Sequence, residues 1–198
     1  MTTATFLGDS FTGGTGANSP STAYCFKTGS RLGWTVTANQ QTGYTDPTLP
    51  FSGAAAAILA APPNVLVIEG GFHDVGSLAA LPAAAAAFLA SVASIPTVIV
   101  LSPIYGSGGG SYGKSYVAAV TPILKAAAIA AGRQFIDLTN LWVTGTGTST
   151  APTGNGNADV YINGSVDGLK LHPTQAGHDY LGTRLAFVIK PPATGLDY

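Results

Sequence analysis

Short apolar segments rich in β-branched residues alternate with helix-like segments along the chain. Two of them contain runs, Val65–Ile68 and Val98–Leu101, in which every residue is apolar. Such runs are typical of parallel strands that helices cover on both faces, whereas a half-buried strand alternates apolar and polar residues. The five segments expected to form strands are residues 3–8, 35–38, 64–71, 97–104 and 134–139.

The segments between these strands have the apolar spacing of helices. Helices are predicted over residues 21–33, 52–62, 78–94 and 111–132, and from about Thr174 onward. The fourth helix is expected to kink at Pro122. Its buried face is expected to consist of Val117, Val120, Leu124 and Ala128. The buried face of the last helix is expected to consist of Leu181, Leu185 and Val188.

This alternation predicts an α/β protein, a three-layer α/β/α sandwich with a flavodoxin-like, doubly wound five-stranded parallel sheet. Ligands of such sheets bind beyond the carboxyl ends of the strands, so functional residues are expected directly after strands. Residues 1–198 are expected to form a single domain, because no repeat and no second domain is visible. Residues 144–159 are rich in Gly, Thr and Asn and are expected to form a surface loop.

Charge and cysteine content narrow the classes of function. The formal net charge is −1 and only 9% of residues are charged, which argues against a nucleic-acid partner. Cys25 is the single cysteine, so no internal disulfide can form, and it is expected to be a small buried apolar residue. No secretory signal follows Met1 and no apolar run has the length of a membrane span. A cytoplasmic or virion-associated protein is therefore expected.

The turn after the first strand, Gly8-Asp9-Ser10, permits two interpretations. Ser10-Phe11-Thr12-Gly13-Gly14-Thr15 fits the S-x-T-G-x-T loop with which flavodoxins wrap the FMN phosphate, since hydroxyls and backbone N–H groups at a helix start bind anions. Alternatively, Ser10 is a nucleophile, which requires a histidine from elsewhere in the fold as its base. The structural alternative is a capping serine beside a turn-forming Asp9.

Only three histidines are available as that base. His172 directly precedes Pro173 and the last helix, His178 is expected to pack or to face solvent within that helix, and His73 follows the third strand. A metal site built on His172 and His178 is not expected, because no further ligands cluster with them.

Four blocks along the chain resemble the SGNH (GDSL) hydrolases. They are Gly8-Asp9-Ser10 after the first strand, a glycine after the second, Gly71-Phe72-His73-Asp74 after the third, and "DGLKLHPTQAGH" near the C-terminus. Each block is short, but together they follow the family's order from Gly8 to about Gly182. The flavodoxin interpretation leaves the C-terminal block unexplained.

The resemblance implies a role for each matching residue. Ser10 corresponds to the nucleophile and His172 to the base, and the backbone N–H groups of Ser10 and Gly43 would contribute to the oxyanion hole. His73 occupies the place of the family's oxyanion-hole asparagine, where a neutral imidazole still offers one N–H. The acid is expected three residues before His172, where this chain has Leu169. Asp167 is the nearest carboxylate, and a Ser–His dyad held by a backbone carbonyl is the alternative.

These roles predict a serine esterase that hydrolyses small acyl esters, such as O-acetyl groups of carbohydrate, without cofactor or metal. The expected partner is the ester or acetylated carbohydrate substrate. Aromatic residues expected near the strand ends could stack on sugar rings or simply pack: Tyr24, Tyr44, Phe72, Tyr105 and Tyr112. Two alternatives stay open, a non-catalytic module of a larger assembly such as a phage virion or tail, and a flavodoxin-like FMN protein.

Overall fold

A five-stranded parallel sheet forms the centre of the molecule. The computed structural model describes residues 1–103, 114–138 and 172–189. Its strands are β1 (Thr2–Gly8), β2 (Trp34–Gln40), β3 (Val65–Glu69), β4 (Thr97–Leu101) and β5 (Gln134–Ile136). Their order in the sheet is β2-β1-β3-β4-β5, and every neighbouring pair is parallel. This is the flavodoxin-like order, in which the chain reverses its direction of winding between β1 and β3.

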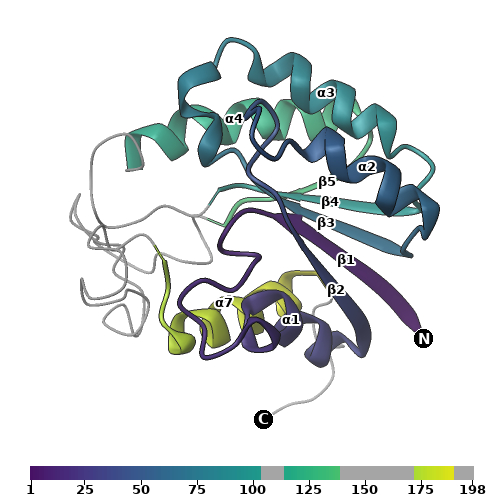
Figure 1. Ribbon diagram of the computed structural model, residues 1–198, viewed down its shortest axis with the longest axis vertical. Coiled ribbons are helices and arrows are strands. Elements are labelled where there is room, and N and C mark those ends of the chain that lie inside the picture. The colour runs from purple at the N-terminus through teal and green to yellow at the C-terminus, as the bar shows by residue number, and fades with distance from the viewer. Residues whose placement is uncertain (104–113, 139–171, 190–198) are drawn as a thin grey trace.

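Helices cover both faces of the sheet, which gives the three predicted layers (Figure 1). One face carries α1 (Tyr24–Leu32) and α7 (Gln175–Ile189). The other carries α2 (Phe51–Ala60), α3 (Leu81–Ser91) and α4 (Lys114–Ala130). Two short 3₁₀ helices, η1 (Pro20–Thr22) and η2 (His73–Ser77), lie in the connections that follow β1 and β3.

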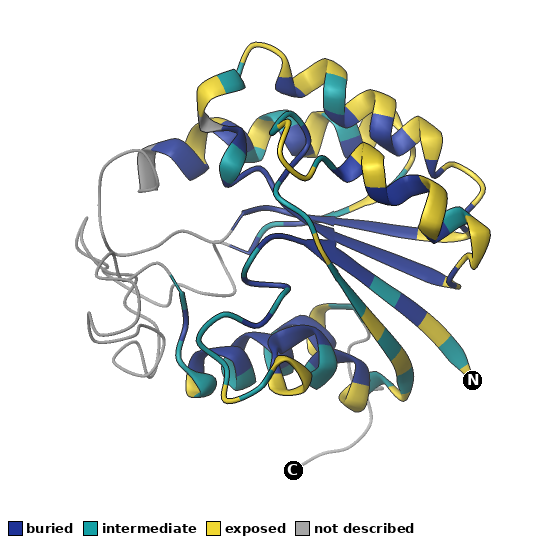
Figure 2. Cartoon of the chain, in the orientation of Figure 1, coloured by how far each residue is buried: buried dark blue, intermediate teal, exposed yellow. Residues whose placement is uncertain are grey.

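Side chains of the inner strands point alternately into the two helical layers. In β3, Val65 and Val67 pack with α1 and α7, whereas Leu66 and Ile68 pack with α2, α3 and α4. All five residues of β3 are buried, whereas β2 lies at the sheet edge and is largely half-exposed (Figure 2). The all-apolar runs of the sequence therefore belong to the inner strands, as predicted.

All five predicted helices occur, with a correction at one residue of α7. The α4 face of Val117, Val120, Leu124 and Ala128 is buried as predicted, and the helix continues through Pro122 to Ala130. In α7, Leu181 and Leu185 are buried, but the prediction for Val188 is wrong because its side chain is 39% exposed. The buried face instead turns toward Gly182 and His178, where α1 lies against α7. Cys25 is buried as expected.

The last residue of the predicted strand 97–104, the last residue of the predicted strand 134–139 and the whole predicted surface loop 144–159 lie outside the described residues. Among the helices that are described, none is long and apolar enough to cross a membrane.

The contact between α1 and α7 depends on a glycine. A Cβ added at Gly182 would lie 2.6 Å from the backbone oxygen of Tyr24 and 2.6 Å from Cβ of Lys27, which is closer than real atoms pack. A side chain at this position would therefore push the two helices apart. Since α7 follows directly from the segment that contains His172, this spacing also affects the functional site.

We predict that Gly182→Ala lowers the free energy of unfolding by about 1–3 kcal/mol through overpacking. The matched control is Gly53→Ala in α2, where the nearest atom to an added Cβ is Cγ of Pro50 at 3.9 Å. That change should instead stabilise the protein by up to about 1 kcal/mol, because alanine favours helix. Urea denaturation of both variants measures the difference, and equal effects of the two would contradict the close contact.

Candidate active site

The hydroxyl of Ser10 lies against the imidazole of His172. The distance between Ser10 Oγ and His172 Nε2 is 2.6 Å, although the two residues are 162 positions apart in sequence. Both side chains are partly exposed, so the pair is open to a ligand. This is the contact that a serine nucleophile needs with its general base.

The turn after β1 presents Ser10 at the carboxyl end of the sheet. Oδ1 of Asp9 accepts a hydrogen bond from the backbone N–H of Phe11 at 2.9 Å, and the carbonyl of Asp9 accepts one from Gly13 N–H at 2.9 Å. A Cβ at Gly8 would lie 2.7 Å from the carbonyl oxygen of Glu69, so the turn passes β3 too closely for any larger residue. The expected structural role of Asp9 in the turn is confirmed.

His172 packs against an aromatic ring, and the helix that follows it is tied to the loop after Ser10. The ring of Phe11 lies 5.2 Å from the imidazole, centroid to centroid. The side chain of Gln175 accepts hydrogen bonds from Asn18 N–H at 2.8 Å and from the Thr22 hydroxyl at 2.7 Å, and it donates one to the Thr22 carbonyl at 3.0 Å. These bonds fix the start of α7 relative to the segment that contains the serine.

His178 makes a second connection between the same two segments. Its Nδ1 accepts a hydrogen bond from Tyr24 N–H at 3.2 Å, and its Nε2 donates to the carbonyl of Thr15 at 3.1 Å. This pattern requires the neutral ring with its proton on Nε2. Burial lowers the pKa of His178 below its ordinary value of 6.5, which favours that neutral form. Of the two expectations for this residue, packing is correct.

Gly43 follows β2, and its loop is clamped by Asp74 from the segment after β3. The carboxylate of Asp74 accepts hydrogen bonds from Tyr44 N–H at 3.2 Å, from Thr45 N–H at 2.5 Å and from the Thr45 hydroxyl at 2.6 Å. A Cβ at Gly43 would lie 2.8 Å from this carboxylate, so the glycine is required there by the close approach. These hydrogen bonds hold the loop after β2 against the segment after β3, at the carboxyl end of β1, the strand between them.

His73 is the first residue of η2, and its ring is half-buried. It contacts Phe72 edge-to-face at 5.6 Å, and Phe72 contacts Phe11 at 5.8 Å. A row of rings thus runs from His73 through Phe72 and Phe11 to His172. Ser10, Gly43 and His73 lie at the carboxyl ends of three adjacent strands, as predicted, and Asp167 lies outside the described residues.

Two buried carboxyl groups lie behind the turn of Ser10. Asp9 and Glu69 are fully buried, and burial raises the pKa of both above their ordinary values. Glu69 was not identified from the sequence, nor were the contacts of Phe11 and Gln175. The available signal was a carboxylate inside an otherwise apolar strand segment. Burying a carboxylate costs free energy unless it is hydrogen-bonded or paired with another charge.

For five aromatic residues, stacking on sugar and plain packing were both left open, and three of them are buried, which agrees with packing. Tyr24, Tyr44 and Phe72 have exposed fractions of 0%, 6% and 3%, so they pack in the core and cannot stack on a ligand. Tyr105 and Tyr112 lie outside the described residues. Within the described ranges, no cluster of three or more His, Cys, Asp or Glu residues has the arrangement of a metal site.

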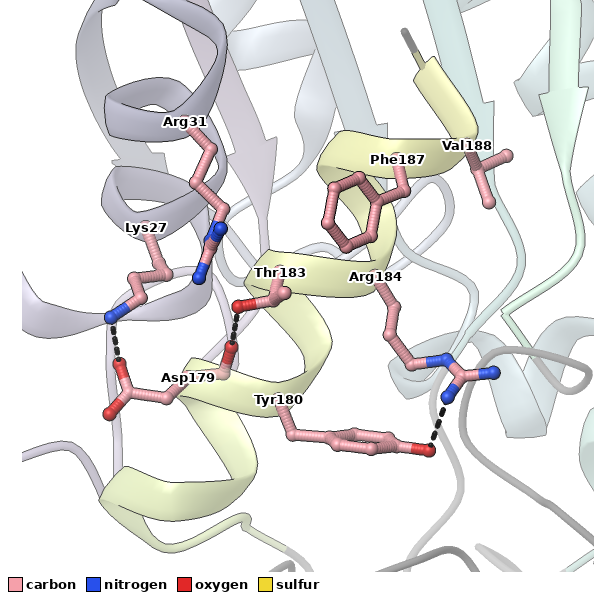
Figure 3. Close-up of a pocket in the computed structure, with 8 residues that line it drawn as sticks. All are labelled: Lys27, Arg31, Asp179, Tyr180, Thr183, Arg184, Phe187 and Val188. Atoms are coloured by element: carbon pink, nitrogen blue, oxygen red, sulfur yellow. Dashed lines mark hydrogen bonds and ion pairs between the residues drawn. The ribbon is translucent and has the colours of Figure 1, made fainter. Parts of the chain in front are cut away.

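A hollow of about 630 Å³ on the outer side of α1 and α7 lies apart from this site. Figure 3 shows charged groups engaged with their neighbours: Lys27 Nζ pairs with Asp179 at 3.1 Å, and the Arg184 guanidinium donates a hydrogen bond to the Tyr180 hydroxyl at 3.1 Å. None of the predicted site residues lines it. It is therefore separate from the contact between Ser10 and His172.

Comparisons with known proteins agree on the fold. The model of the GDSL-like lipase/acylhydrolase family matches residues 6–180. No curated protein matches the sequence. A lipase/acylhydrolase from Enterococcus faecalis is similar in structure, with a TM-score of 0.72 at 16% identity over 96% of each chain. A member of the lipolytic G-D-S-L family from Veillonella parvula has a TM-score of 0.68 at 14% identity, over 96% of this chain and 99% of that one.

A third similar structure is a two-domain esterase active on acetylated mannans. Its TM-score is 0.61 at 17% identity, and the match covers 95% of this chain but only 48% of that one. At these identities the likeness shows the α/β fold.

We predict that His178 makes stability depend on pH. Its lowered folded-state pKa means that the stabilisation is fully present above about pH 6.5 and is lost as the pH falls through the folded value. His178→Phe keeps a ring against Tyr24 but leaves Tyr24 N–H without its acceptor, which should cost about 1–3 kcal/mol at pH 7.5. Thermal denaturation from pH 5 to 7.5 should show the gap between the two proteins narrowing in acid. A gap that is constant with pH would contradict the neutral His178.

Proposed function

The chain belongs to the GDSL-like lipase/acylhydrolase family, and on that basis we propose that it is a serine esterase. The single observation that carries this proposal is the 2.6 Å contact between Ser10 Oγ and His172 Nε2. The same contact favours an esterase over an FMN protein, because a phosphate loop would have no use for an imidazole on its serine. A non-catalytic module of a larger assembly would likewise have no use for an imidazole on this serine.

In the proposed reaction, Ser10 Oγ attacks the ester carbonyl carbon while His172 Nε2 takes the hydroxyl proton. The tetrahedral intermediate then collapses, and His172 gives the proton to the leaving alkoxide, so an alcohol leaves and the acyl group stays on Ser10. A water molecule repeats the sequence on the acyl-enzyme, again with His172 as base. The carboxylic acid leaves and Ser10 is restored, with no cofactor needed.

The oxyanion of each tetrahedral intermediate would be stabilised by the backbone N–H groups of Ser10 and Gly43 and by the imidazole N–H of His73. The Asp74 clamp supports this role for Gly43, because it holds that loop beside the exit of β3. For the orientation of His172 we propose Asp167, with a backbone carbonyl as the alternative.

For the substrate we propose small acyl esters, with O-acetyl groups of carbohydrate as the leading class. The similar two-domain esterase is described as active on acetylated mannans, and a chain with 9% charged residues offers few groups to bind a charged substrate. The burial of Tyr24, Tyr44 and Phe72 means that any stacking on sugar must come from other residues.

We predict that Ser10→Ala abolishes ester hydrolysis and labelling by a fluorophosphonate probe while the melting temperature changes little. Ser10 Oγ lies at a partly exposed position and its loss removes one hydrogen bond, worth about 1 kcal/mol. Peptide mapping of the labelled parent should find the modification on Ser10 alone. The control is Ser91→Ala, whose hydroxyl bonds to the Phe88 carbonyl, remote from the site, and which should keep full activity and labelling. A Ser10→Ala variant that hydrolyses p-nitrophenyl acetate like the parent would refute the assignment.

We predict that His73→Ala lowers kcat by roughly 10²–10³, the usual loss for one oxyanion-hole donor. His73→Asn should retain or raise activity near pH 7, because an amide always offers its N–H whereas the imidazole must adopt the right tautomer. If both variants match the parent from pH 5 to 8, His73 does not contact the oxyanion.

A further inference from the structure

Asp9 and Glu69 form a pair of buried carboxyl groups next to the turn that carries Ser10. Glu69 is the last residue of β3 and Asp9 follows the last residue of β1, two strands that are neighbours in the sheet. Both side chains are 0% exposed. The two carboxyl groups lie close enough for one retained proton to bridge them.

The hydrogen bonds around the pair leave two carboxyl oxygens without a donor, one on each group. Asp9 Oδ1 accepts from Phe11 N–H, and Glu69 Oε2 accepts from the Thr12 hydroxyl at 3.5 Å, a long contact. Asp9 Oδ2 and Glu69 Oε1 are buried and receive no donor from the described residues. Two carboxylates side by side in the interior would repel each other, whereas one retained proton supplies the missing donor and removes one charge.

The surroundings favour the negative charge on Asp9 and the proton on Glu69. Asp9 has the short backbone N–H bond from Phe11, and its charge is attracted by the imidazoles of His73 and His172. Glu69 faces Asp9, the hydroxyls of Thr12 and Tyr24, and Tyr44, with no cation among its described neighbours.

We propose that Asp9 and Glu69 share one proton at neutral pH and act as a single buried negative charge that stabilises the protonated form of His172 during catalysis. Asp9 and Glu69 are positioning residues, since neither touches the reacting atoms. The catalytic part of this inference rests on the proposed esterase function, but the shared proton does not.

The shared proton predicts a carboxylic acid that persists at pH 7. Glu69 is the single glutamate of the chain, so ¹³C labelling of glutamate side-chain carboxyl groups reports this residue alone. Infrared spectroscopy of the labelled protein should show one protonated C=O stretch at pH 7, and Glu69→Gln should remove it. A spectrum with no protonated glutamate at pH 7 would overturn the proposal, whether or not the protein is an esterase.

The charge is tested by two variants that differ in it alone. Glu69→Gln keeps the donor and leaves the anion on Asp9, so kcat/KM should stay within about threefold of the parent. Asp9→Asn combined with Glu69→Gln keeps both side-chain shapes and the acceptor for Phe11 N–H but removes the charge. Its plateau of kcat/KM should fall by about tenfold, the equivalent of one pH unit of differential stabilisation.

The pH profile separates an electrostatic role from a structural one. Without the anion, the protonated imidazole of His172 is less stable, so the acid limb of kcat/KM should move to lower pH in the double variant than in Glu69→Gln. Superimposable profiles of the two variants, at equal melting temperatures, would overturn the catalytic part. If the parent protein hydrolyses no ester, the esterase function is refuted instead. The infrared band would still show whether Asp9 and Glu69 share a proton.

Discussion

The contact between Ser10 and His172 depends on how firmly the first loop of the chain is fastened to its last helix. The residues are far apart in sequence, and no strand pairing connects them, because α7 lies on the face of the sheet rather than in it. Gln175 and His178 supply the connection from successive turns of α7, each through hydrogen bonds to the segment that follows Ser10. Gly182, one turn further on, lets the two helices approach closely enough for these bonds to form.

Close backbone approach is also what joins the other parts of the site. Gly8 passes β3 without room for a side chain, and Gly43 meets the Asp74 carboxylate in the same way. These two contacts draw the exits of β1, β2 and β3 together. Two glycines of the sequence blocks, Gly8 and Gly43, are thus explained by packing, which also fixes the backbone that carries the proposed N–H donors of Ser10 and Gly43.

Much of this arrangement could be predicted from the sequence, because the signals are periodic and local. The apolar runs of β3 and β4 and the spacing of Val117 and Val120 in α4 reflect burial directly, and the structure confirms them. For Tyr24 and Tyr44 the sequence left two alternatives open, stacking on a ligand or packing, because an aromatic side chain near the sheet edge can point into the core or out of it. That choice depends on tertiary partners such as His178 and Phe51, which local sequence does not reveal.

Local sequence also does not reveal whether a charged side chain is buried, and this is why Glu69 was missed. Among the described residues, the buried acidic side chains are Asp9, Glu69 and Asp74, and all three lie at the carboxyl ends of β1 and β3. No lysine or arginine is buried in the described ranges, so the interior near the site has only negative and neutral groups to offer. Such an interior offers no cation to balance two ionised carboxyl groups, so it favours one retained proton on the pair Asp9 and Glu69.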